Sequence, residues 1–275
     1  LLLLLLLLLL LLRCLGTVDR WMMRGYGRRL FPLVGVEPPF TLGRDVVGEV
    51  VALGPLAWGF AKGQMVVAAT HPTAAGSHAD YTVVAETATA LLPSGLAAER
   101  AAALPFAALT AWRALNGLAR VQPGQTVVVH GAAGSVGSFA TQYLANHVGC
   151  HVIATCRPEK ISQLQRQCAN ATVLSVDDFL AATADGAQGS AQQHELACDV
   201  VLDGLGRGVA DGAVQRQSLA VLREGGHLLD LNGQLIRAID DLGDGADGER
   251  EFNFATQLKA TAKAAAELAG MLQSM

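Results

Sequence analysis

The most informative stretch of this sequence is Gln125-Thr126-Val127-Val128-Val129-His130-Gly131-Ala132-Ala133-Gly134-Ser135-Val136-Gly137. An unbroken apolar run, typical of a strand buried on both faces, leads into a Gly-x-x-Gly-x-x-Gly loop, and a helical apolar pattern follows over 136–148. Glycine allows the backbone to turn sharply off the strand and to approach a diphosphate closely. The stretch therefore predicts a strand, a loop and a helix whose first amides, around Ser135 to Gly137, bind a dinucleotide.

Downstream of about residue 105, strand-like runs alternate with helical segments, which predicts an α/β domain with a doubly wound parallel sheet. The expected strands are Thr126–His130, His151–Thr155, Thr172–Val176, Asp199–Asp203 and His227–Leu231, and the expected helices are 136–148, 159–168 and 213–222. Upstream, the chain is rich in glycine, proline and β-branched residues. Alternating runs at Val46–Val51, Met65–Ala68 and Tyr81–Val84 predict a small antiparallel β-domain there.

The residues after the second expected strand of the α/β domain indicate which dinucleotide binds. Domains that bind NAD place an acid there to hold the ribose 2′-hydroxyl, whereas this chain has Cys156, Arg157 and Lys160. A guanidinium and an ammonium suit a 2′-phosphate, so the sequence predicts NADPH as the cofactor rather than NADH. Glu159 is the contrary residue, and we expect it in the first turn of the next helix. The alternative is that both cations are ordinary solvated surface residues.

Composition and charge exclude several classes of protein. The chain is 51% hydrophobic and 16% charged, with a net charge of −4, so we expect no nucleic-acid partner. Residues 1–12 are all leucine, which as a helix is too short for a stable membrane span. We interpret this run as an artefact, a repeat expansion or a targeting remnant outside the fold, with a membrane anchor as the least favoured reading. Five scattered cysteines suggest neither a disulfide framework nor a zinc knot.

A further block, Leu104-Pro105-Phe106-Ala107-Ala108-Leu109-Thr110-Ala111-Trp112, precedes the glycine loop. Together they resemble the zinc-independent quinone oxidoreductase branch of the medium-chain dehydrogenase/reductases. The segments 23–27 and 40–50 are similar to those of the mitochondrial reticulon-interacting NADPH oxidoreductases. The resemblance implies a GroES-like domain over 13–105 and a Rossmann domain over 106–240, with the nicotinamide in a cleft between them. An acidic loop and an Ala-rich helix are expected over 241–275, and the family's terminal strands are missing from both domains.

The resemblance also implies roles for individual residues. It gives the cofactor loop Gly131, Gly134, Ser135, Val136 and Gly137. It places Thr110 near the nicotinamide, Asp203 and Gly204 beside the adenine and ribose, and Leu231 and Asn232 beside the nicotinamide ribose. Tyr26 matches a tyrosine that lines the quinone pocket in some relatives and is the catalytic candidate, or else a half-buried aromatic residue. The pocket asparagine of the family is replaced within Gly16–Asp19.

No metal is expected, because Gly43-Arg44-Asp45 stands where zinc-dependent relatives have Gly-His-Glu and because His71 and His78 lack a thiolate partner. We interpret His130 as a structural residue rather than a proton donor. The resulting hypothesis is NADPH-dependent hydride transfer to a quinone or another conjugated carbonyl, which needs no metal. The alternatives are a 2-enoyl-thioester reductase and a catalytically weak NADPH-binding scaffold. The resemblance suggests a mitochondrial protein, with the cytoplasm as alternative, and leaves a homodimer open.

Overall fold

The structure is a computed structural model that describes residues 5–14, 16–24, 39–70, 74–184, 195–205 and 213–231. It divides into two compact units between Leu109 and Thr110, a point that lies within helix α3 (Pro105–Trp112). Each unit contains a sheet of its own. The expected acidic loop and helix over 241–275 lie outside the described residues.

Within its described residues, the first unit contains a five-stranded antiparallel sheet in the order β4-β1-β2-β3-β5. The strands are β1 (Leu5–Cys14), β2 (Asp45–Leu53), β3 (Met65–Ala69), β4 (Tyr81–Ala85) and β5 (Thr89–Leu91). Its short helices are α1 (Thr17–Met23), a 3₁₀ turn over Glu86–Ala88, and α2 (Ala98–Ala101). The antiparallel β-domain predicted from three alternating runs is confirmed.

The leucine run forms most of strand β1. The expectation that the leucine run stands outside the fold is wrong for residues 5–12, because β1 begins at Leu5 and lies between β2 and β4. Leu8 pairs with Val50 and with Thr82, and its side chain is fully buried. A strand needs inward apolar residues at every second position. A uniform leucine run supplies them without any alternation that a periodicity analysis could detect.

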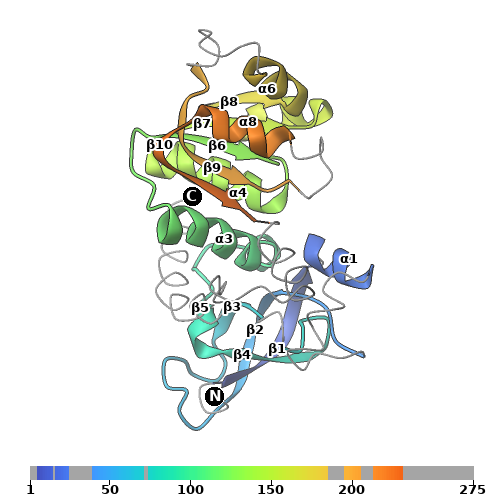
Figure 1. Cartoon of the computed structure of the whole chain (residues 1–275). Coiled ribbons are helices and arrows are strands. Elements are labelled where there is room, and N and C mark those ends of the chain that lie inside the picture. Colours follow the sequence, from blue (N-terminus) through green and yellow to red (C-terminus); the bar gives the residue numbers. More distant parts are fainter. Residues whose placement is uncertain are drawn as a thin grey trace, which may run out of the picture. The chain divides into compact units, whose positions relative to one another are not determined.

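The second unit contains a parallel sheet whose described strands follow the order β10-β9-β6-β7-β8 (Figure 1). The strands are β6 (Thr126–His130), β7 (His151–Cys156), β8 (Ala171–Ser175), β9 (Cys198–Asp203) and β10 (Leu222–Asp230). The helices are α4 (Ser135–Tyr143, continued as a π-helical turn to Val148), α5 (Ile161–Gln167), α6 (Val176–Thr183) and α8 (Ala213–Val221). All five expected strands are present, so the doubly wound Rossmann sheet is confirmed.

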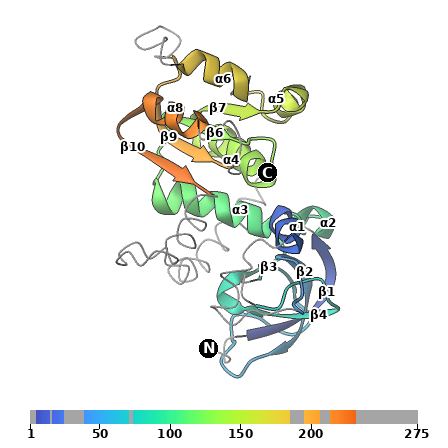
Figure 2. The same cartoon turned by 45° about the vertical axis from the view of Figure 1, so that its right-hand side comes forward.

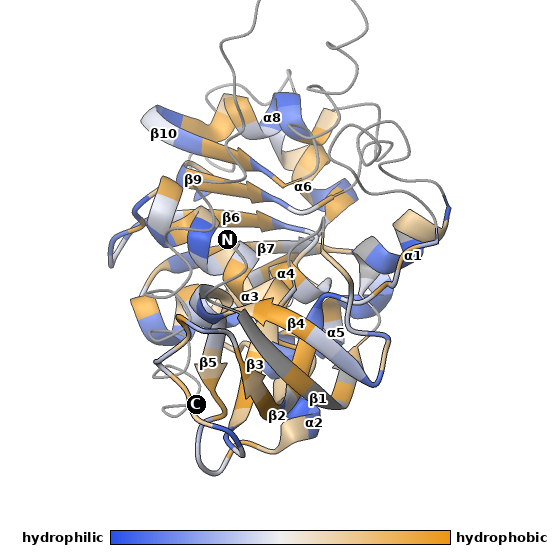
Figure 3. Cartoon of the chain, turned by 90° about the horizontal axis from the view of Figure 1, so that it is seen from below, coloured by the Kyte–Doolittle hydropathy of each residue, from blue (hydrophilic) through white to orange (hydrophobic). Residues whose placement is uncertain are grey.

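Helices cover both faces of this sheet. Val128, Ile153 and Val201 pack with Phe179 of α6 and Val221 of α8 in one buried cluster. Successive residues of a strand face opposite sides, and the alternate valines of β6 are equally buried. Figure 2 shows α4 across the sheet from α6 and α8, and Figure 3 shows hydrophobic residues along most of β6 and β9.

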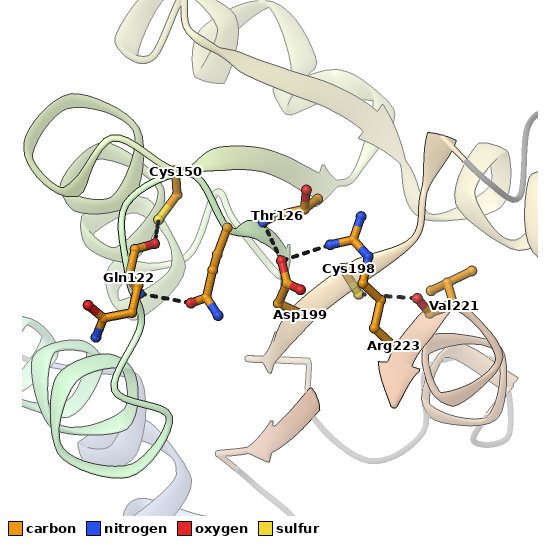
Figure 4. A network of polar contacts seen from close by, with 8 residues as sticks. Gln122, Thr126, Cys150, Cys198, Asp199, Val221 and Arg223 are labelled. Carbon is orange, nitrogen blue, oxygen red and sulfur yellow. Dashed lines mark hydrogen bonds and ion pairs between the residues drawn. The ribbon is translucent and has the colours of Figure 1, made fainter. Parts of the chain in front are cut away.

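A polar network holds the amino ends of the strands together (Figure 4). The Asp199 carboxylate accepts hydrogen bonds from the Thr126 amide and from Arg223 Nη1, both at 2.8 Å. The Cys150 thiol donates to the Gln122 carbonyl at 3.5 Å nearby. This edge is therefore occupied by structural contacts, and the opposite edge, at the carboxyl ends of the strands, is where a ligand of a doubly wound sheet binds.

None of the helices in the described segments is long and apolar enough to cross a membrane.

Candidate functional site

The glycine loop lies at the carboxyl end of β6, where the strand order reverses between β6 and β9. Gly131 leaves the strand with φ +71°, a left-handed conformation that favours glycine. The Ala132 amide donates to the Thr155 carbonyl at 2.9 Å, and the Gly134 amide donates to the Gly131 carbonyl at 2.9 Å. The first bond fixes the loop to β7 and the second closes a turn within the loop, at the position where such sheets bind their ligands.

Close packing requires one of the three glycines, Gly137, and leaves little room at Gly131. A Cβ at Gly137 would collide with the Gly131 carbonyl and lie 2.8 Å from Ala132 Cα. A Cβ at Gly131 would lie 3.2 Å from the backbone of Gly204, in the turn after β9. The loop, the start of α4 and the turn after β9 thus approach one another at backbone distance.

The first turn of α4 leaves its amides without a partner inside the helix. The helix begins at Ser135, and the Ser138 amide is the one that donates to the Gly134 carbonyl, at 2.8 Å. The amides of Ser135, Val136 and Gly137 precede it and therefore have no acceptor within the helix. Gly134 has no side chain that could cap them, and Ala133, Gly134 and Ser135 are exposed. A diphosphate fits this turn, because the amides and the helix dipole favour an anion and the small residues leave room for it.

The turn after β9 is held by the buried carboxylate of Asp203. It accepts hydrogen bonds from the Leu205 amide at 2.9 Å and from Gln215 Nε2 at 3.0 Å. Burial raises the pKa of Asp203, and the two hydrogen bonds act in the opposite direction. The Gly204 amide donates to the His130 carbonyl at 3.1 Å, and the Leu231 amide to the Asp203 carbonyl at 3.0 Å.

The structure therefore brings several predicted residues to one edge of the sheet: Gly131, Gly134, Ser135, Val136, Gly137, Asp203, Gly204 and Leu231. Thr110 is half-buried in α3, and its role beside the nicotinamide stays a prediction. Asn232, the catalytic candidate Tyr26 and His71 lie outside the described residues.

The tip of β7 contains the residues predicted to distinguish the two dinucleotides. Cys156 is buried, and Arg157 follows it with its side chain 76% exposed. Arg157 Nε lies 3.3 Å from Glu159 Oε1, in an ion pair that the sequence does not reveal. Lys160 Nζ donates to Gln163 Oε1 at 3.1 Å. Glu159 lies in a 3₁₀ turn, Pro158–Lys160, directly before α5, close to where we expected it.

His130 is a structural residue, as its position at the end of β6 suggested. Its ring is 1% exposed, with Nδ1 2.8 Å from Thr155 Oγ1 and Nε2 2.8 Å from Ser218 Oγ. The Ser218 hydroxyl donates to the Val214 carbonyl at 2.6 Å, so it accepts the proton of Nε2, and Nδ1 accepts from Thr155. Burial lowers the pKa of His130 to about 4. Thr155, Ser218 and Gln215 could not be recognised from the sequence, because only the fold brings the first two to His130 and the third to Asp203.

In the first unit, Arg44 is 2% exposed and its Nη2 donates to Met22 Sδ at 3.3 Å. The Asp19 carboxylate accepts from the amides of Gly16 at 2.8 Å and Gly43 at 2.7 Å. Asp45 accepts from the Phe106 amide at 2.7 Å, and burial raises its pKa to about 6. Among the described residues, no three His, Cys, Asp or Glu side chains lie together as metal ligands would.

Comparisons of sequence agree with this architecture. Residues 15–105 match the family described as the alcohol dehydrogenase GroES-like domain. The chain is 27% identical over 236 residues to the mitochondrial NAD(P)H oxidoreductase RTN4IP1 of Dictyostelium discoideum, covering 82% of this chain and 63% of that protein. It is 35% identical over 200 residues to polyketide synthase GfsB of Streptomyces halstedii, covering 72% of this chain and 3% of that protein. The chain thus spans less than two thirds of these curated relatives.

Solved structures with the same fold include two that bear on the site. The quinone oxidoreductase of Coxiella burnetii has a TM-score of 0.69 and 27% identity, covering 97% of this chain and 80% of that one. A mycobacterial protein solved in complex with NADPH has a TM-score of 0.68 and 26% identity, covering 98% of this chain and 80% of that one. The resemblance stated from the sequence motifs is confirmed by these comparisons.

Proposed function

Since this chain is a relative of the NAD(P)H oxidoreductases and of the quinone oxidoreductases, we propose that it is an NADPH-dependent oxidoreductase that transfers hydride to a quinone or another conjugated carbonyl. One observation carries the proposal furthest. The amides of the first turn of α4 have no acceptor within the helix and lie at the switch point of a doubly wound sheet, between an exposed glycine loop and the Asp203 turn.

The residues at this edge divide the work of binding. The amides of Ser135, Val136 and Gly137 hold the diphosphate, and the glycines let the backbone approach it. Arg157 and Lys160, at the end of β7, pair with the 2′-phosphate. Asp203, Gly204, Leu231 and Asn232 contact the sugars and the adenine, and Thr110 lies near the nicotinamide. The bound NADPH supplies the hydride, and the protein orients it and excludes water.

The chemistry of the side chains restricts the acceptor. Arg44 cannot bind a metal, and the ring nitrogens of His130 are both engaged in the interior. The Asp203 carboxylate is likewise held by Leu205 and Gln215. These side chains supply neither a metal ligand nor a proton, so the acceptor must delocalise its own negative charge. A quinone or an enone does so, and water completes its protonation. Tyr26 lines the acceptor pocket in this proposal.

The test is consumption of NADPH, followed by its near-ultraviolet absorbance, by the complete open reading frame with a panel of quinones. We expect quinone-dependent oxidation that weakens in Arg157→Glu, whereas Arg166→Glu, a matched change on exposed helix α5, leaves it unchanged. Tight NADPH binding without turnover on any acceptor would identify a scaffold instead. Absence of nucleotide binding would refute the proposal.

The similarity to a polyketide synthase supports a second candidate, reduction of a 2-enoyl thioester. Such an acceptor also delocalises charge, and its carrier would need a basic patch. The nearest basic pair, Arg28 and Arg29, lies outside the described residues. A higher kcat/KM with crotonyl-CoA than with quinones would favour this candidate.

The name of the Dictyostelium relative includes a mitochondrial location, and we propose the same compartment for this protein. Fractionation of cells that express the tagged full reading frame tests it. Enrichment with a mitochondrial matrix marker is expected, and a purely cytosolic distribution would contradict it.

A further inference from the structure

The tip of β7 has two cations and one anion, and they are not equivalent. Lys160 is hydrogen-bonded to the neutral Gln163, so its charge remains uncompensated in that contact. Arg157 is paired with Glu159 at 3.3 Å. The local charge of these three side chains is therefore +1, where the two cations alone would give +2.

The ion pair also fixes where the carboxylate of Glu159 lies. Glu159 follows the strand by three residues, yet its carboxylate turns back to the side chain of Arg157, directly after β7. Burial raises the pKa of the Cys156 thiol, and the negative charge of Glu159 raises it further. The ion pair thus places the carboxylate beside the end of the strand, where dinucleotide domains use an acid to read a ribose 2′-hydroxyl.

We propose that Glu159 determines the nucleotide preference of this site in two ways. It competes with the 2′-phosphate of NADPH for Arg157, and it accepts a hydrogen bond from the ribose 2′-hydroxyl of NADH. The inference rests on the proposed function, since it concerns the same nucleotide site. It predicts a protein that uses both nucleotides, with a preference for NADPH that Glu159 keeps small.

The two nucleotides interact with the pair in opposite ways. When NADPH binds, Arg157 turns to the phosphate, the ion pair is lost, and the Glu159 carboxylate repels the new dianion. When NADH binds, the ion pair persists and the Glu159 carboxylate accepts a hydrogen bond from the ribose 2′-hydroxyl. Because the side chains of Arg157 and Glu159 are 76% and 59% exposed, water screens the pair and the effect is modest.

The experiment measures dissociation constants of NADPH and NADH by quenching of protein fluorescence. In Glu159→Gln we expect NADPH to bind about 2- to 5-fold more tightly and NADH to bind more weakly, in keeping with an exposed ion pair. Glu224→Gln is the matched control, because Glu224 is an exposed glutamate on β10 outside the proposed binding residues. It should leave both constants unchanged.

A second pair of variants tests whether Glu159 acts through Arg157. In an Arg157→Gln background, Glu159→Gln should improve NADPH binding less than it does in the wild type. If Glu159→Gln leaves both constants unchanged, or shifts both in the same direction, the inference is overturned while the proposed function stands. If the wild-type protein binds neither nucleotide, the proposed function fails and the inference with it.

Discussion

The backbone of Gly137 passes so close to the glycine loop that no side chain fits there. Its Cβ position lies 2.8 Å from Ala132 Cα, and both neighbours that it would meet are backbone atoms. A flexible side chain could move aside, but the backbone of a loop fixed by hydrogen bonds on two sides cannot do so cheaply. A side chain at Gly137 would therefore displace either the start of α4 or the glycine loop.

We predict that Gly137→Ala destabilises the protein by about 1–3 kcal/mol, the usual cost of overpacking, and weakens NADPH binding about tenfold or more. Urea unfolding and a nucleotide titration measure the two effects. Gly117→Ala is the control, because a Cβ at Gly117 meets nothing within 4 Å. A Gly137→Ala protein that binds NADPH as tightly as the wild type would show that the loop geometry is not needed.

The buried imidazole of His130 couples the stability of the second unit to pH. In the folded chain it stays neutral until the pH falls to about 4, while in the unfolded chain it protonates near its ordinary value of about 6.5. Between these values the unfolded chain binds more protons. Its contribution to the free energy of unfolding is therefore fully present above pH 6.5 and is lost as the pH falls.

We predict that wild-type stability, relative to that of His130→Asn, declines between pH 6.5 and 4 by up to about 1.4 kcal/mol per pH unit. The comparison between variants is essential, because burial raises the pKa of Asp45 to about 6 and gives the opposite pH dependence over part of this range. Urea unfolding at pH 7 and pH 5 measures the difference. Parallel pH profiles for the two proteins would contradict a buried, neutral His130.

Strand β1 shows how an element can be essential without a sequence signature. Its backbone pairs with β2 and β4, and Leu8 belongs to a buried cluster with residues of three other strands. The cluster contains Leu8, Val46, Val50, Val66, Ala68 and Val84. Without this strand, β4 and β2 would lose their common neighbour in the sheet.

Leu8→Ala should therefore destabilise the protein by about 2–5 kcal/mol, the range for truncating a fully buried leucine. Leu91→Ala, on β5, is the matched change at a side chain that is 50% exposed and should cost less than about 1 kcal/mol. Thermal unfolding of both variants measures the contrast. Equal stability of the two variants would mean that the leucine run contributes nothing to the fold.

The strands of the second unit were predictable because each is an apolar run bounded by turns, and β6 agrees residue for residue. Helix α6 was not predicted, although Ser175 caps it: the Ser175 hydroxyl oxygen accepts a hydrogen bond from the Asp178 amide at 2.9 Å. That Ser-x-x-Asp signal was present in the sequence, but the expected strand was extended over it. Strand β10 begins at Leu222 rather than at the expected His227, and its pairing with β9 is irregular between these two residues.

From the residue pattern alone, the candidate site was predictable only where it is local in sequence, and the distant Asp203, Gly204 and Leu231 were implied by the family resemblance. The glycine loop and the start of α4 follow from one continuous stretch. The contact of His130 with Ser218 spans 88 residues, and no spacing rule could have indicated it. The pairing of Arg157 with Glu159 depends on side-chain orientation, which the sequence leaves open.

The net charge of the whole molecule does not favour the binding of an anionic nucleotide. With 20 Lys and Arg against 24 Asp and Glu, the chain carries a net charge of −4. Binding of NADPH must therefore depend on local groups: the amides that open α4 and the cations after β7. These groups all belong to the second unit, and their contact with the nucleotide can be measured directly.

That measurement is the NMR chemical shift of individual backbone amides during titration with NADPH. We predict that the amides of Ser135, Val136 and Gly137 show the largest downfield shifts, because a diphosphate oxygen accepts their hydrogen bonds. Titration with inorganic phosphate should move the same amides less. If saturation with NADPH leaves the chemical shifts of these three amides unchanged, the proposed diphosphate site is contradicted.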